Sequence, residues 1–335
     1  MGTSKLHDHF STSRVNLASA KFGADAIYAT DDFFADKSRM LAETEPIFIP
    51  DKYDENGKWM DGWESRRKRE FGYDYCIVKL AFPGSIDVIV IDTSHFTGNY
   101  PPFASVDACT CPDWDPDEST QWIEVLSKSP LKGNAAFRYQ VEHDKVFTHV
   151  RLNIYPDGGI ARFKVFGRVH CLWKTRDPIQ TYDLISLENG GRPVAWNDAH
   201  FGHPVNMLGR RRGVNMGDGW ETHRRRESGN DWCVLELGHI GKIEKIVVDT
   251  AHFKGNYPDC CSIQAANVAN VSDEHLTDES TDWPLLLPES KLSADAIHEF
   301  VGEIVDIGPI SHVRLNIFPD GGISRLRLFG KFIRK

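Results

Sequence analysis

The sequence lacks any apolar run near the roughly 20 residues that a membrane-spanning helix requires. Its first residues, 1–9, are polar and do not contain the apolar centre of a secretory signal peptide. The net charge is −9 at pH 7, so positive charge is scarce for a protein that binds nucleic acid or an anionic membrane. These absences predict a cytoplasmic protein whose partner is neither a membrane nor a nucleic acid.

Regular cysteine pairing is also lacking. The seven Cys are an odd number, and only Cys76 and Cys233 occupy equivalent places in the repeat described below. A disulfide framework usually pairs more regularly, which indicates reduced thiols and again a cytoplasmic setting. Neither a Cys-x-x-Cys nor a His-Glu-x-x-His pattern occurs, so a structural zinc site is not expected. The chain also shows no Gly-rich phosphate loop and no convincing long helix.

The sequence does contain an internal repeat, in which one module occurs twice. The stretch 61–70 begins Asp-Gly-Trp-Glu and returns at 218–227 with acids, an indole and guanidinium groups in similar order. Two further motifs recur: Asp-Thr-x-His-Phe-x-Gly-Asn-Tyr-Pro at 92–101 and 249–258, and Pro-Asp-Gly-Gly-Ile-x-Arg at 156–162 and 319–325. Fixed charge at this density is costly to bury unless it is paired. The first motif is therefore either a salt-bridged surface turn or a recognition site for a small, charged, hydrogen-bonding molecule.

Short β-rich segments lie between the motifs. Residues 75–80 and 86–93, with their counterparts 232–237 and 243–250, are rich in β-branched side chains and bounded by Gly or Pro, which predicts strands. Alternation on both sides of Pro-Asp-Gly-Gly predicts a β-hairpin that closes each module. Mostly strand, with turns at regular spacing, each module is predicted to be all-β, either a β-sandwich or a jelly roll.

The repeat also predicts where the domains begin and end. We expect two tandem modules that superpose on each other, residues 15–170 and 179–335, with a short link at 171–182. The first copy carries ten extra residues around 49–57 that are rich in turn formers, so this insertion is predicted to be an exposed loop. The second copy is six residues longer in the variable stretch before its last motif.

The three paired motifs resemble those of the allantoicase family, in the same order and over almost the whole chain. The resemblance implies two tandem jelly-roll modules similar to galactose-binding-like domains. It implies hydrolysis of allantoate to ureidoglycolate and urea, in the breakdown of purines through allantoin, by a homo-oligomer. The copies differ just after the shared Asn-Tyr-Pro, where Pro102 stands in one and Asp259 in the other.

Arginine is the natural anchor for the substrate that this resemblance implies. Allantoate is an acetate that carries two ureido groups on one carbon, and guanidinium meets carboxylate in a two-pronged geometry. Arg67 and Arg224 occupy the same place in the two copies, as do Arg69 and Arg226. All four are predicted to bind substrate. The alternative is that they only neutralise neighbouring glutamates.

Two pairs of residues are the candidates for proton transfer. Glu64 and Glu221 each follow a Trp, which can desolvate the carboxyl and raise its pKa toward the range of a general acid. An ion pair is the alternative role. His95 and His252 lie just past a predicted strand and can act as acid or base near neutral pH. A His that is satisfied by a backbone carbonyl in a turn is the alternative there.

The remaining candidates are neutral side chains. Asn99 and Asn256 match a urea edge in both donor and acceptor, so they are predicted substrate contacts. Trp63 and Trp220 are also predicted substrate contacts. The alternative is that they belong to the core, where an indole in such a position is found more often. The Asp of Pro-Asp-Gly-Gly is explained by its turn. A divalent metal is possible because hydrolysis can use a metal-bound water, but no ligand spacing identifies one.

Two other functions fit the same sequence. Jelly-roll modules often bind a ligand without chemistry, so a tandem carbohydrate- or small-ligand-binding protein is one alternative. A purely structural repeat is another. Exposed aromatic platforms favour sugar binding, whereas clustered Arg, Glu, His and Asn favour a compact anion as ligand.

Overall fold

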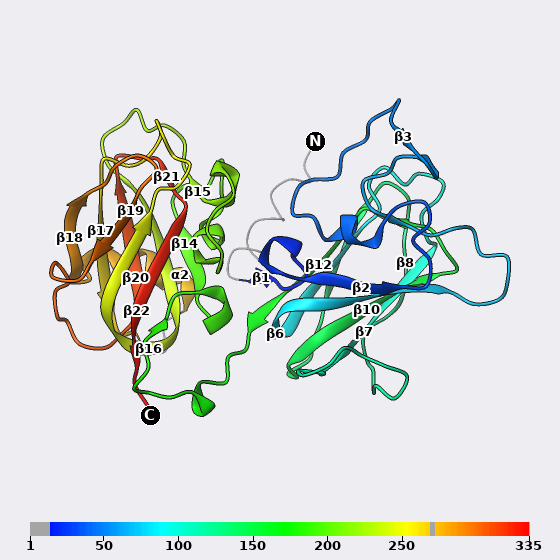
Figure 1. Ribbon diagram of the computed structural model, residues 1–335, viewed down its shortest axis with the longest axis horizontal. Coiled ribbons are helices and arrows are strands. Elements are labelled where there is room, and N and C mark those ends of the chain that lie inside the picture. The colour runs from blue at the N-terminus through cyan, green and yellow to red at the C-terminus, as the bar shows by residue number, and fades with distance from the viewer. Residues whose placement is uncertain (1–13, 269–271, 335) are drawn as a thin grey trace. The chain divides into compact units, whose positions relative to one another are not determined.

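A computed structural model describes residues 14–268 and 272–334. The chain divides into two compact units, one spanning Val15–His170 and one that begins at Cys171. Both are built almost entirely from strands and 3-10 turns (Figure 1). No helix in the described ranges is long and apolar enough to cross a membrane.

The first module has twelve strands in chain order. They are β1 Val15–Asn16, β2 Asp25–Ala29, β3 Tyr53–Asp54, β4 Gly57–Lys58, β5 Trp63–Glu64, β6 Asp74–Asp92, β7 Phe103–Cys109, β8 Ile123–Pro130, β9 Ala136–Gln140, β10 Phe147–Tyr155, β11 Gly159–Ile160 and β12 Arg162–Val169. The 3-10 turns are η1 Ala20–Phe22 and η2 Lys37–Leu41. The main path of hydrogen-bonded strands is β1-β12-β6-β10-β7-β8, and β2 and β9 also pair with β6.

Strand β6 connects the two layers of the module. Its first half pairs with β2 and β10, and its second half pairs with β9 and β12. A strand has only two edges within one sheet, so four partners require the halves to lie in different layers. The sequence predicted two separate strands here, 75–80 and 86–93. The structure corrects this to one strand of 19 residues that continues through Pro83 and Gly84.

The predicted closing hairpin is wrong. Strand β10 pairs with β6 and β7, and β12 pairs with β6 and β1, so the two strands beside Pro-Asp-Gly-Gly do not face each other. Between them, β11 pairs with β5, the strand that carries Trp63 and Glu64. The turn therefore carries the chain from one layer to the other and is docked on the first motif. Strand alternation alone does not distinguish such a crossover from a hairpin.

The second module repeats this arrangement. Its strands are β13 Tyr182–Asp183, β14 Arg192–Trp196, β15 Trp220–Glu221, β16 Asp231–Asp249, β17 Cys260–Ala266, β18 Leu285–Lys291, β19 Ile297–Phe300, β20 Ile310–Phe318, β21 Gly322–Ile323 and β22 Arg325–Phe332. Its helices are η3 Trp173–Thr175, η4 Leu187–Asn189, η5 Pro204–Leu208, η6 Met216–Asp218, α2 Asp273–Glu279 and η7 Ser280–Asp282. The path β13-β22-β16-β20-β17-β18 matches that of the first module, and β15 pairs with β21. The predicted all-β tandem fold is confirmed.

The two modules differ where their lengths differ. The insertion at 49–57 is exposed and forms the small β3–β4 hairpin, as its turn formers predicted. The longer stretch of the second module contains α2, whose Leu276 packs against Val194 and Val234. The central strand β10 is buried on both faces: Val150, Leu152 and Ile154 are fully buried on one face, and His149 and Asn153 are buried on the other. All seven Cys have free thiols.

Candidate functional site

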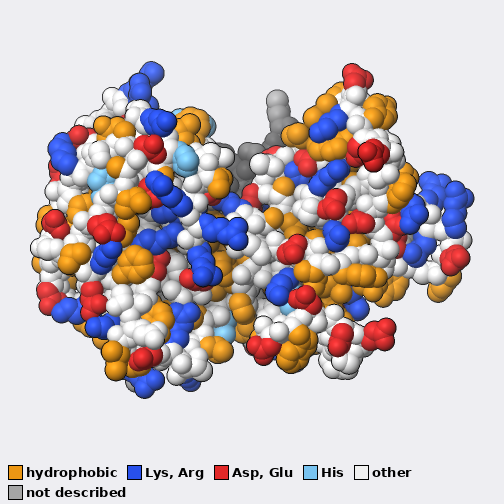
Figure 2. Space-filling view, in the orientation of Figure 1, with side chains coloured by type: hydrophobic (Ala, Val, Ile, Leu, Met, Phe, Trp, Pro, Cys, Tyr) orange, Lys and Arg blue, Asp and Glu red, His pale blue; other side chains and the backbone are white. Residues whose placement is uncertain are grey.

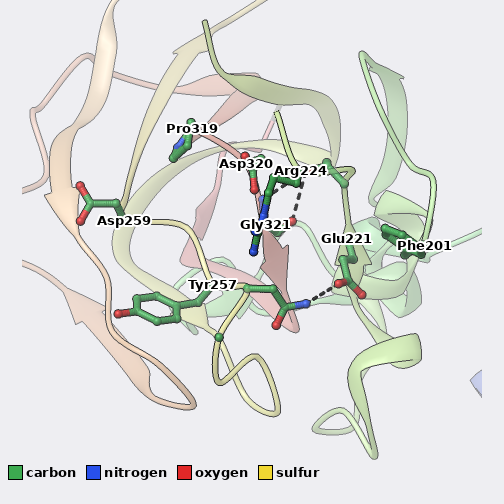
Figure 3. A pocket seen from close by; sticks show the side chains of 11 residues that line it. Phe201, Glu221, Arg224, Tyr257, Asp259, Pro319, Asp320 and Gly321 are labelled. Atoms are coloured by element: carbon green, nitrogen blue, oxygen red, sulfur yellow. Dashed lines mark hydrogen bonds between the residues drawn. The ribbon is translucent and has the colours of Figure 1, made fainter. Parts of the chain in front are cut away.

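The second module contains a pocket of about 400 Å³ formed where the three motifs meet. Its lining residues are Phe201, Glu221, Thr222, Arg224, Gly255, Asn256, Tyr257, Asp259, Pro319, Asp320 and Gly321. Glu221 comes from β15, Asn256 from the loop after β16, and Gly321 from the turn before β21. Figure 3 shows Arg224 extending into the space between Asp320 and Glu221. The volume suits a small molecule rather than a polymer.

Side chains of the charged stretch alternate between anchored and free. His223 lies 3.3 Å from Asp198, and Arg225 forms an ion pair with buried Asp231. Between and beyond them, the exposed side chains of Arg224 and Arg226 make no hydrogen bond or ion pair with any described residue. The free guanidinium groups are the ones available to an anion.

The first module has the same alternation. Arg66 pairs with Asp31 at 2.7 Å, and Lys68 pairs with buried Asp74 at 2.6 Å. Arg67 and Arg69 are exposed and have no such partner in the described part of the chain. The alternative that these arginines neutralise nearby glutamates is therefore not what the structure shows. Arg226 does not line the main pocket; with Arg224 it borders a shallower hollow beside it.

Glutamate and asparagine of two different motifs meet in each module. The Asn256 side-chain amide donates to Glu221 Oε1, and the Asn99 amide donates to Glu64 Oε1 at 2.6 Å. Burial raises the pKa of Glu64, and the hydrogen bond from Asn99 opposes this by stabilising the carboxylate. The carboxyl is thus shielded from water as a general acid requires, and the amide fixes its orientation.

His252 does not line the pocket of the second module, and both predicted histidines contact backbone carbonyls. His95 Nε2 is 3.1 Å from the Pro46 carbonyl oxygen, and His252 Nε2 is 2.8 Å from that of Gly213. Both have positive φ, 70° and 72°, a conformation that is uncommon for residues other than Gly. The structure therefore shows them satisfied by backbone carbonyls in turns and does not bring His252 together with Glu221.

The predicted tryptophan contacts are corrected by burial. Trp63 and Trp220 are fully buried, and each indole N–H donates to a backbone carbonyl, of Asp31 and Asp198 respectively. Neither ring has a surface that a ligand can reach. They are packing residues beneath the charged stretch, and the large apolar area of an indole suits that place.

Sequence reasoning missed several residues of the pocket. Tyr257 was within a quoted motif, directly after Asn256, so its place in the repeat was an available signal. Asp320 was explained by its turn alone. Phe201 lies in a loop that belongs to no motif, and no sequence pattern marks it. Arg, Glu and Asn converge here, rather than a row of exposed aromatic platforms.

The visible surface of each module is electrically mixed. Figure 2 shows Lys and Arg side chains interspersed with Asp and Glu over the visible face of each module. Within residues 14–268 and 272–334, no group of three or more His, Cys, Asp or Glu is placed to hold a metal ion.

The fold and the pocket define a class: a duplicated all-β protein whose motif residues converge on a small pocket lined by Arg, Glu, Asn and Asp side chains. A family model described as Allantoicase repeat matches residues 15–170 and 182–333. The chain belongs to the allantoicase family.

Individual relatives agree with this assignment. A protein of Photobacterium profundum named "Probable allantoicase" is 58% identical over 316 residues, covering 94% of this chain and 96% of the relative. "Probable allantoicase 1" of Burkholderia mallei is 53% identical over 321 residues, covering 96% and 95%. The crystal structure of allantoicase from Saccharomyces cerevisiae matches with a TM-score of 0.81 at 34% identity, covering 95% of this chain and 93% of that one.

Proposed function

We propose that the chain hydrolyses allantoate to ureidoglycolate and urea, in purine breakdown through allantoin. The observation that carries this proposal is the pocket itself, where Arg224, whose guanidinium has no partner among the described residues, faces the same space as Glu221 held by Asn256. A carboxylate flanked by ureido groups needs this combination of a cation and directional polar groups. Membership of the allantoicase family supports the substrate.

Arg224 binds the substrate carboxylate, and this places the central carbon of allantoate near Glu221. The amide of Asn256 uses its N–H on Glu221, so its oxygen is left to accept from a ureido N–H. Glu64, Arg67 and Asn99 have the same roles in the first module. We assign both proton transfers to the glutamates, because the histidine rings are bonded to loop carbonyls.

The reaction then follows in two steps. The protonated glutamate gives its proton to one ureido nitrogen, and the bond from that nitrogen to the central carbon breaks to release urea. The other ureido nitrogen donates its electron pair and leaves an imine-like carbon. Water adds to this carbon and returns a proton to the carboxylate, which restores the acid. One carboxyl thus serves as acid and then as base.

Urea release from allantoate tests the proposal directly. Glu64→Gln, Glu221→Gln and the double variant also count the sites, since two independent pockets leave about half of the activity in each single variant. If only one pocket works, one of the two single variants loses nearly all of the activity and the other keeps it. No urea from the unaltered protein at millimolar allantoate would refute the function.

We also propose that the protein is a cytoplasmic homo-oligomer. The pocket is open, Arg224 is exposed, and a site that must exclude water is often finished at a subunit border. Seven free thiols fit a reducing compartment. Sedimentation at micromolar concentration tests the assembly, and a monomer there contradicts it.

A further inference from the structure

The Asp of each Pro-Asp-Gly-Gly turn does more than shape its own turn. Asp320 Oδ2 accepts the backbone N–H of Arg225 at 2.8 Å, and Asp157 Oδ2 accepts that of Lys68 at 2.8 Å. These partners lie 95 and 89 residues earlier in the sequence. An Asp that only caps a turn bonds a backbone group two residues away. The carboxylate is therefore a link between the third motif and the first.

Backbone bonds complete this link on both sides. Thr222 N donates to the Gly321 carbonyl at 3.1 Å, and Gly321 N donates to Thr222 Oγ1 at 3.1 Å. Gly322 N donates to the Asn256 carbonyl at 2.8 Å. The first module has the same bonds among its equivalent residues. The turn thus joins the segments that supply the glutamate, the arginine and the asparagine of the pocket.

The turn has no room to shift. Gly321 has φ of 134°, and a Cβ placed on it would lie 2.7 Å from the Asn256 carbonyl oxygen. Gly322 is packed against Phe253, with a Cβ position 1.9 Å from its ring. Because a side chain fits at neither position, the turn requires glycine there and packs closely on Asn256 and Phe253, while Asp320 links it to the backbone of the charged stretch.

Arg225 is held from two directions as a result. Asp320 accepts its backbone N–H, and the buried Asp231 pairs with its guanidinium. Its neighbour Arg224 has no partner of its own among the described residues, so its position depends on this anchoring of the backbone. Asp320 also lines the pocket.

We propose that Asp320, and Asp157 in the first module, are positioning residues for the reaction. Each holds the backbone beside the anchoring arginine, so that the guanidinium meets the substrate carboxylate while the glutamate faces the departing ureido group. This inference rests on the proposed function and adds to it. A binding geometry that is off by about 1 Å costs up to roughly 100-fold in rate, so this support has a measurable effect.

The test separates the hydrogen bond from the negative charge. Asp320→Ala, Asp320→Asn and Asp320→Glu are made in a Glu64→Gln background, and the same changes of Asp157 in a Glu221→Gln background. At least one set then reports on a working pocket. KM and kcat for allantoate are measured by urea release, and thermal unfolding records the fold. Asp117→Ala is the matched control, because exposed Asp117 accepts a backbone N–H from Ser119 at 2.9 Å in an unrelated loop.

Positioning predicts a distinct pattern across the three variants. Ala removes a charge-assisted bond, so KM rises roughly 10- to 100-fold with a smaller change in kcat. Asn keeps an acceptor oxygen and restores KM to within about threefold, whereas Glu keeps the charge but displaces it and does not restore KM. Asp117→Ala leaves KM unchanged.

Two results would overturn the proposal. KM unchanged in the Ala variant means that the link does not position the arginine. If kcat falls strongly in the Asp→Asn variant and recovers in the Asp→Glu variant, the carboxylate acts through its negative charge or as a base. If the Ala variant does not fold, the contrast between Asn and Glu alone decides between these readings. Absence of urea release from the unaltered protein refutes the proposed function instead.

Discussion

Replacing Arg162 by Met should destabilise the first module strongly. Arg162 is 1% exposed, yet every part of its guanidinium has a partner. Nε donates to the Thr44 carbonyl at 2.7 Å, and Nη2 donates to the Asp61 carboxylate at 2.7 Å. Nη1 donates to the carbonyls of Asp61 and Ala161 at 2.9 and 2.7 Å. Met fills similar volume but supplies none of these bonds.

The magnitude follows from what is left behind. Removing one partner of a buried ion pair costs about 3–5 kcal/mol, because the other charge stays buried without compensation. Asp61 keeps 15% of its side chain exposed and still accepts a bond from the Ile47 backbone, so we expect the lower end, about 3 kcal/mol. Against a total stability of about 5–15 kcal/mol for a typical domain, this is a large loss.

Guanidinium chloride unfolding, followed by circular dichroism, measures the effect without adding the reaction product urea. Arg66→Met is the matched control, since the Arg66 side chain is 62% exposed and pairs with Asp31 at the surface. We expect it to cost about 1 kcal/mol or less. Equal losses in the two variants, or loss of urea release from Arg162→Met without loss of stability, would refute the structural role.

Three further predictions concern the pocket. Arg67→Lys with Arg224→Lys keeps the charge but removes the planar fork, so KM should rise while the fold persists. An unchanged substrate dependence of urea release would mean that neither arginine binds the substrate. Glu64→Gln with Glu221→Gln should lower kcat roughly 100- to 10,000-fold, and a smaller loss in steady-state kinetics would argue against general acid catalysis. Because burial raises the pKa of Glu64, the stability this group contributes is present below its ordinary pKa of 4.5 and is lost as the pH rises through the folded value. Glu64→Gln should therefore be more stable than the starting protein in guanidinium chloride at neutral pH and no more stable in acid, and a lower midpoint at neutral pH would contradict this.

Much of the architecture was predictable because the module occurs twice in the sequence. Repeated β-branched segments and turn formers indicated the all-β fold, and they indicated the exposed insertion at 49–57. The continuity of β6 was not predictable from local pattern, because Pro83 and Gly84 normally end a strand. The layer crossing at Pro-Asp-Gly-Gly was missed for a related reason: alternation describes a strand and not its partner.

The site was predictable to the level of residue type. Repetition pointed to Glu221, Arg224 and Asn256, which the structure places around one pocket. Repetition did not distinguish them from Trp220, because residues that are needed for packing recur in a motif just as residues that contact a ligand do. Which charges are free depends on acids far away in the sequence, such as Asp198, and only the fold identifies those.

The docking of the last turn on the first motif has a consequence for synthesis of the chain. The backbone of Lys68 can bond Asp157, and the carboxylate of Asp61 can bond Arg162, only after those later residues have been synthesised. Arg162 lies 101 residues after Asp61. Contacts of such long range form late in folding, because loop closure must precede them. As the chain is made from its N-terminus, the pocket of the second module forms only after Asp320 and Gly321 have been added. A chain that stops before Asp157 keeps the glutamate and both arginines of its first module, yet it lacks the bond from the Lys68 backbone to Asp157 and the pairing of β11 with β5.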